Sequence, residues 1–150
     1  MYIRELEVTY SKKINIPENF QKEEFRVVGP KSIQKLFNKI VKQNTKENLL
    51  LFCLDQHNQV TYYNIISIGS NNISLAHPRE IFQPAILSNS NRIVLAHNHP
   101  TGNLEPSTAD IDITKRVQEL GEIFGIELLD SIVVSTEDDR YYSMYENGKI

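Results

Sequence analysis

Residues 92–135, RIVLAHNHPTGNLEPSTADIDITKRVQELGEIFGIELLDSIVVS, decide the fold of this 150-residue chain. The apolar run at 92–99 predicts a short buried strand that leads straight into two histidines. After a loop, residues 107–125 predict a long helix that ends at Gly125, and residues 126–135 predict another strand. A strand, a helix and a second strand in this order indicate an α/β unit in which the helix packs against a sheet.

The segments upstream continue the alternation of helices and strands. Apolar residues recur at helical spacing in residues 29–44. A continuous apolar run at 48–55 predicts a strand buried on both faces, and residues 60–69 predict the next strand. A helix is expected over 78–90, where Pro84 either kinks it or delays its regular part. Together these elements predict an α/β fold, a mixed β-sheet with flanking helices.

The two ends of the chain carry weaker patterns. A final strand is expected at residues 141–146, after a polar turn. At the other end, residues 2–10 alternate enough for a strand, and residues 11–24 are typical of an exposed polar arm. We therefore divide the chain into an N-terminal arm or strand extension, residues 1–29, and one domain, residues 30–150. The exposed arm leaves self-association open, and the oligomeric state does not follow from the sequence.

Composition and charge narrow the class of protein. Apolar residues make up 40% of the chain and charged residues 23%, which is typical of an ordinary globular domain. The formal net charge of −3 gives no general attraction to phosphate backbones, so net charge does not favour nucleic acid as a partner. The sequence shows neither a signal peptide nor a membrane-spanning run, so we expect a cytoplasmic protein with no membrane partner.

The single cysteine, Cys53, excludes an intramolecular disulfide and a cysteine-rich zinc site. It lies in an apolar run, where a free cysteine is expected to be buried. A nucleobase deaminase is excluded too, because the chain contains neither H-x-E nor P-C-x-x-C. The letters HNH at residues 97–99 do not indicate an HNH nuclease, since those enzymes spread their named residues over a larger unit.

Two of the four histidines, His97 and His99, stand at the end of a predicted strand. Side chains two apart on a strand point the same way, and loops beyond strand ends commonly hold ligands. Asp110 lies about one turn into the following helix, and the loop can return it towards the two imidazoles. Two imidazoles and one carboxylate suit Zn²⁺ and leave a fourth tetrahedral position for water, as catalytic zinc sites do.

Simpler interpretations remain open for these residues. Ser107 and Asp110 also match, loosely, the capping box of a helix N-terminus. A structural zinc site would need a fourth protein ligand, and His77 is the only remaining histidine near the others in sequence. His57 lies in a polar turn, where we expect it to be exposed.

The joint spacing of these residues resembles a known motif. From His97 to Asp110 the chain follows the pattern H-x-H-x7-S-x-x-D, the JAMM motif of the MPN (also called JAB) metallohydrolases. More narrowly, residues 77–135 resemble the RadC family, with further similarity in the strand before them and the segment after them. The resemblance covers roughly residues 30–150.

The resemblance implies a three-layer, cytidine-deaminase-like fold. It also implies a zinc ion whose ligands are His97, His99 and Asp110. In related peptidases the motif serine, here Ser107, stabilises an oxyanion, and an upstream glutamate acts on the zinc-bound water. Glu47, just before a buried strand, is the matching glutamate, and Glu80 remains the alternative.

The chain departs from the family pattern at three points. Thr101 replaces a usual serine and keeps a hydroxyl, whereas Ser131 replaces a frequent histidine and so removes an imidazole. The helix-hairpin-helix region of full-length members is not in this sequence, so a DNA-repair role gains little support.

The resemblance implies a zinc-dependent hydrolase that cleaves a peptide or isopeptide bond in a peptide or protein substrate. The alternative is a catalytically silent MPN-like binding module in DNA metabolism or mobile-element biology. Such a module would be expected to have lost a metal ligand, and none is lost here. The domain could also be catalytically silent if Glu47 does not reach the zinc-bound water.

Overall fold

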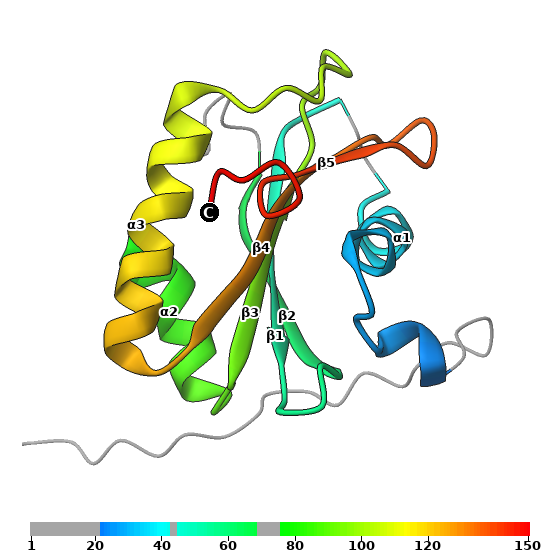
Figure 1. The fold of residues 1–150 in the computed structure, drawn as a ribbon. Coiled ribbons are helices and arrows are strands. Elements are labelled where there is room, and N and C mark those ends of the chain that lie inside the picture. The colour runs from blue at the N-terminus through cyan, green and yellow to red at the C-terminus, as the bar shows by residue number, and fades with distance from the viewer. Residues whose placement is uncertain (1–21, 43–44, 69–75) are drawn as a thin grey trace, which may run out of the picture.

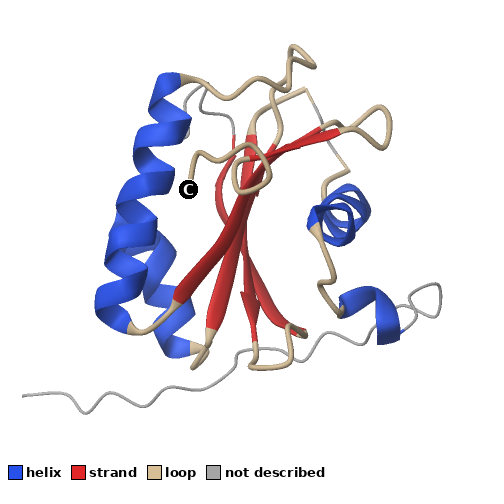
Figure 2. Ribbon diagram, viewed as in Figure 1, coloured by secondary structure: helices blue, strands red, loops and turns tan. Residues whose placement is uncertain are grey.

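A five-stranded mixed sheet lies between two layers of helices in the computed structural model, which describes residues 22–42, 45–68 and 76–150 (Figure 1). The strands are β1 (Asn48–Leu54), β2 (Val60–Ile68), β3 (Arg92–His97), β4 (Glu127–Val134) and β5 (Tyr141–Ser143). The helices are the 3₁₀ helix η1 (Lys22–Phe25) and the α-helices α1 (Pro30–Ile40), α2 (Pro78–Leu87) and α3 (Thr108–Phe124). Figure 2 shows α1 on one side of the sheet and α2 and α3 on the other.

The sheet has the order β2-β1-β3-β4-β5. β1 pairs antiparallel with both β2 and β3, β3 pairs parallel with β4, and β4 pairs antiparallel with β5. The parallel pair is joined through α3, because parallel neighbours need a crossover connection. The predicted mixed sheet and the three-layer arrangement are both confirmed.

Each face of the sheet carries its own apolar cluster. On the α1 face, Ile33 and Phe37 of the helix pack with strand residues such as Phe52. On the opposite face, Ile81 of α2 and Val117 of α3 belong to the other cluster. All of β1 is buried, as its unbroken apolar run predicted, because helices cover both of its faces.

Several element boundaries differ from the prediction. α2 ends at Leu87 rather than at residue 90, and it continues through Pro84. The final strand, expected at 141–146, ends at Ser143. It ends early because the main chain turns back: Tyr145 N donates a hydrogen bond of 3.0 Å to Asp130 Oδ1.

The N-terminal segment is described only from Lys22 onward. The strand predicted at 2–10 lies outside the described residues, as does most of the predicted arm. Its last residues contribute to η1, and Arg26 then forms an isolated antiparallel bridge with Gln59. None of the helices in the described part of the chain is long and apolar enough to cross a membrane.

The ends of α3 fix its position against the sheet. Ser107 is the N-cap, and Gly125 ends the helix in the left-handed conformation with φ of 69°. One turn earlier, Gly121 lets the chain return closely, since Ile126 N donates to Gly121 O at 2.8 Å. A tight exit into β4 therefore anchors the helix whose first turn carries Asp110.

Candidate metal centre

Two histidine side chains meet at the end of β3. His97 is the last residue of the strand, pairs with Leu49 of β1 and Val133 of β4, and is 0% exposed. His99 follows the strand and is partly exposed. Their Nε2 atoms lie 3.1 Å apart. Both imidazoles therefore meet at the end of β3, the central strand of the sheet.

Asp110 reaches this point from the first turn of α3. Its Oδ2 atom lies 3.5 Å from His97 Nε2 and 3.3 Å from His99 Nε2. A capping box orients it: Ser107 N donates to Asp110 Oδ2 at 2.8 Å, and Asp110 N donates to Ser107 Oγ at 3.1 Å. The capping box considered from the sequence therefore forms, and it directs the carboxylate towards the histidines.

The three side chains form a group that could hold a metal ion. Ligands bound to Zn²⁺ at ordinary distances in a tetrahedron would be about 3.3 Å from one another. The three observed separations between ligand atoms are 3.1, 3.3 and 3.5 Å. The donor set of two imidazoles and one carboxylate also matches that of a catalytic zinc site, so these residues fit such an ion.

The backbone fixes the orientation of one histidine. His99 Nδ1 lies 2.7 Å from the carbonyl oxygen of Asn103, a contact that requires Nδ1 to carry the proton. When the ring is neutral, its Nε2 lone pair is then directed into the cluster, as a metal ligand requires. His97 Nδ1 is buried and has no hydrogen-bond partner among the described residues.

Burial and charge act differently on the three groups. Burial lowers the pKa of His97, against an opposing effect of Asp110, and so favours the neutral ring that binds metals. In the metal-free protein, the hydrogen bond that a protonated His99 Nε2 donates to Asp110 raises the pKa of His99, and a bound metal ion would take the place of that proton. Burial by itself would raise the pKa of Asp110, but hydrogen bonds from both histidines outweigh it and hold that pKa well below its usual range.

The two candidate glutamates lie in different surroundings. Glu47 is buried, 6% exposed, directly before β1, and its charge contributes to the raised pKa of His99. Glu80 is exposed in the first turn of α2, where its Oε2 accepts a hydrogen bond from His77 N at 3.1 Å. The structure thus brings Glu47 towards the cluster and uses Glu80 in the cap of a helix.

The other residues singled out from the sequence lie apart from the three ligands. His77 is the exposed N-cap of α2, and its Nδ1 accepts from Arg79 N at 3.1 Å. His57 is exposed in the β1–β2 turn, as predicted. Cys53 is buried and free, as predicted, and burial raises the pKa of its thiol. Ser131 is buried in β4, and its Oγ has no partner among the described residues.

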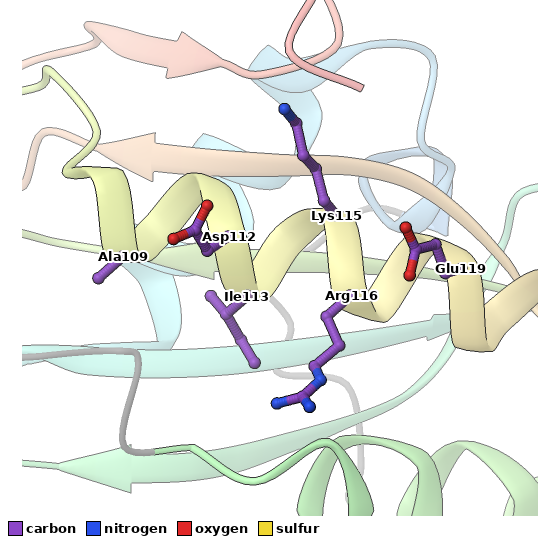
Figure 3. Close-up of a pocket in the computed structure, with 6 residues that line it drawn as sticks. All are labelled: Ala109, Asp112, Ile113, Lys115, Arg116 and Glu119. Atoms are coloured by element: carbon purple, nitrogen blue, oxygen red, sulfur yellow. The ribbon is translucent and has the colours of Figure 1, made fainter.

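A surface hollow of about 420 Å³ lies along α3. Its lining begins at Ala109, next to the ligand Asp110, and reaches Glu119. Lys115 and Arg116 both line the hollow, and Figure 3 shows them extending from different sides of α3. All of the residues that line this hollow belong to α3, and it was not predicted from the sequence.

Comparison with known protein families gives a match over residues 27–149 to the family described as RadC-like JAB domain. The chain belongs to the RadC family. The RadC-like domain thus combines a JAB fold with a His-His-Asp group that fits a JAMM-type arrangement.

Similar proteins come from bacteria and archaea. A UPF0758 protein of Desulfitobacterium hafniense is 43% identical over 120 residues, which make up 80% of this chain and 52% of that protein. UPF0758 proteins of Clostridium botulinum (40% over 127 residues; 85% and 55%) and Methanosarcina barkeri (37% over 123 residues; 82% and 53%) are also similar. The RadC-like chain therefore spans about half the length of these curated relatives, whose names state no function.

Proposed function

We propose that the RadC-like domain is a zinc-dependent hydrolase that cleaves a peptide or isopeptide bond. The observation that carries this proposal is the set of three ligand atoms at tetrahedral separations, with a buried glutamate whose charge acts on His99. Bound there, zinc would supply Lewis-acid polarisation of a carbonyl and lower the pKa of water. The three protein ligands leave one position open, which favours catalysis over a purely structural role.

Two side chains of the domain would act on the substrate. Glu47 takes the proton of the attacking water and passes it to the leaving amine, which requires a carboxylate within reach of both. Ser107 donates a hydrogen bond to the carbonyl oxygen as that oxygen gains charge. The Ser107 hydroxyl already accepts from Asp110 N, and because a hydroxyl can accept and donate together, its proton can serve this second role.

Metal analysis tests the ligand assignment. Purified protein is expected to carry about one zinc ion per chain, as a three-ligand site implies. His97→Ala and Asp110→Ala should each abolish zinc binding. Stoichiometric zinc in both variants would show that other residues hold the metal.

Turnover of peptide and isopeptide substrates by the zinc-loaded protein tests the catalytic role. Glu47→Gln should keep its zinc and lose about 10²–10⁴ in rate, the usual contribution of an acid–base group. Glu80→Gln is the matched control, because glutamine can also serve in the capping box of α2.

Two results would count against the proposal. If Glu80→Gln loses activity while Glu47→Gln behaves as the wild type, the base has been assigned to the wrong residue. If the zinc-loaded wild type cleaves no peptide or isopeptide substrate, the domain is better described as an MPN-like binding module.

A further inference from the structure

The residue between the two histidines in the sequence, Asn98, has a buried amide side chain. Asn98 is 1% exposed. Its Oδ1 accepts a hydrogen bond from Asn48 N at 2.9 Å, and its Nδ2 donates to the carbonyl oxygen of Lys46 at 3.1 Å. A second amide supports the same carbonyl, since Asn48 Nδ2 also donates to Lys46 O, at 2.9 Å.

These two main-chain groups flank Glu47. The carbonyl of Lys46 belongs to the peptide bond before Glu47, and the N–H of Asn48 belongs to the peptide bond after it. One side chain therefore holds both peptide bonds of a single residue. An amide offers the same donor and acceptor as a peptide group, so Asn98 extends the pairing of β1 with β3 beyond the last strand pair.

The directions of the His97 and Asn98 side chains explain why this contact does not interfere with the metal ligands. Leu49 and Leu95 belong to the apolar cluster on the α3 face, and Leu50 and Ala96 belong to the cluster on the α1 face. Alternation along β3 then puts His97 on the α3 face, towards Asp110. Asn98, the first residue after the strand, instead directs its amide to the main chain at Lys46 and Asn48.

We propose that Asn98 is a positioning residue for the hydrolytic reaction, holding the main chain of Glu47 so that its carboxylate faces the metal centre. The inference rests on the proposed role of Glu47. Thr45 and Lys46, which lead into Glu47, are exposed, whereas the two hydrogen bonds from the amide are buried or part-buried and help to fix where this segment lies. Small displacements matter here, because a shift of about 1 Å in a reacting group can cost about 10²-fold in rate.

Kinetics of the zinc-loaded protein test this role. Asn98→Ala should keep its zinc and lose about 10²-fold in kcat with KM little changed. Asn98→Asp keeps the acceptor for Asn48 N but places a carboxylate oxygen against the Lys46 carbonyl, which repels it, so this variant should also lose activity. If Asn98→Ala fails to fold, the kcat and zinc content of Asn98→Asp test the positioning role instead. Gln34→Ala is the matched control, because it removes a hydrogen bond of the same kind, from Gln34 Nε2 to Asp138 O, in another part of the domain.

A double variant shows whether Asn98 acts through Glu47. Because the two residues serve one step, Asn98→Ala in the Glu47→Gln background should cost little beyond Glu47→Gln alone. Independent losses that multiply, wild-type kcat in Asn98→Ala, or loss of zinc together with activity would each overturn the proposal.

Two further measurements do not depend on turnover. The Asn48 amide should lose its hydrogen-exchange protection in Asn98→Ala and keep it in Gln34→Ala. In the cobalt-loaded protein, Asn98→Ala should change the visible absorption spectrum in the same direction as Glu47→Gln, since the first displaces and the second removes the carboxylate charge near the ion. If the wild type proves inactive, the proposed function fails, and these two measurements alone test whether Asn98 positions Glu47. An unchanged spectrum or a protected Asn48 amide would overturn the inference.

Discussion

At the scale of single residues, the metal centre depends on side chains that each serve two purposes. Asp110 closes the capping box of α3 and presents the same oxygen to both histidines. Ser107 caps the helix and stands beside the ligand that it orients. A substitution at either position therefore affects both the stability of the helix and the chemistry of the site, and only paired variants separate the two effects.

Ser107 offers such a pair. Ser107→Ala should lower the free energy of unfolding by about 0.5–2 kcal/mol through loss of the cap. It should also lower turnover by about 10²–10³ through loss of the oxyanion donor. Ser107→Asp restores a cap but, when ionised, cannot donate, so it should unfold like the wild type and remain nearly inactive.

Chemical denaturation, turnover and zinc content must be measured together on these two variants, because a new carboxylate near the ligands could itself bind the metal. A stable Ser107→Asp protein with normal zinc and normal turnover would show that Ser107 is only a helix cap.

The grouping of His97, His99 and Asp110 could be predicted from the sequence because their spacing along the chain is itself the signal. The hydrogen bonds that surround these residues could not be predicted from the sequence. The Asn103 carbonyl that orients His99 and the Asn98 amide that holds Glu47 depend on the path of the main chain beyond two strand ends. Asparagine in a loop is too common for either contact to stand out in one sequence.

At the scale of elements, α3 and β4 are joined so closely that no side chain fits between them. A β-carbon at Gly121 would lie 2.3 Å from the carbonyl oxygen of Ile126. Gly121→Ala would gain about 1 kcal/mol of helix propensity but would force a backbone atom to move, which typically costs about 1–3 kcal/mol. We expect a net loss in the free energy of unfolding, measured by denaturant titration.

The neighbouring Glu122→Ala change is the control, since this residue is exposed on α3 and should change stability little. A Gly121→Ala protein that is more stable than the wild type would mean that the close contact relaxes without cost.

Periodicity and turn residues were enough to predict the order of helices and strands, because α3, β1 and β3 have long, clear apolar patterns. Boundaries were less predictable. The final strand was expected to extend to residue 146, but it stops at Ser143, beyond which Asp130 of the neighbouring strand β4 accepts a hydrogen bond from Tyr145 N. Such a contact joins residues far apart in the sequence, and no local pattern reveals it.

At the scale of the whole molecule, Asp130 makes stability depend on pH. Burial raises the pKa of this carboxyl, although hydrogen bonds from Ser143 Oγ and Tyr145 N lower it in part. The folded state therefore binds the proton more tightly than the unfolded chain does. This contribution to stability is present at low pH and is lost as the pH rises through the raised pKa.

Asp130→Asn removes the titration and serves as the reference. The free energy of unfolding of the metal-free wild type, relative to that of Asp130→Asn, should be higher at about pH 4 than at about pH 7. Urea denaturation at both pH values measures it. A difference that is constant or that grows towards neutral pH would contradict the raised pKa.

The metal centre joins the end of β3 to the start of α3 across the loop of residues 100–106, so an ion bound there would act as a reversible cross-link. An ion that binds only the folded chain raises the free energy of unfolding. The affinity for the metal and the Tm of the domain are therefore linked. A chelator should lower the Tm of the wild type and leave that of His97→Ala unchanged, and scanning calorimetry with and without zinc would detect this. Loss of the bound ion in a cell would then decrease the lifetime of the domain.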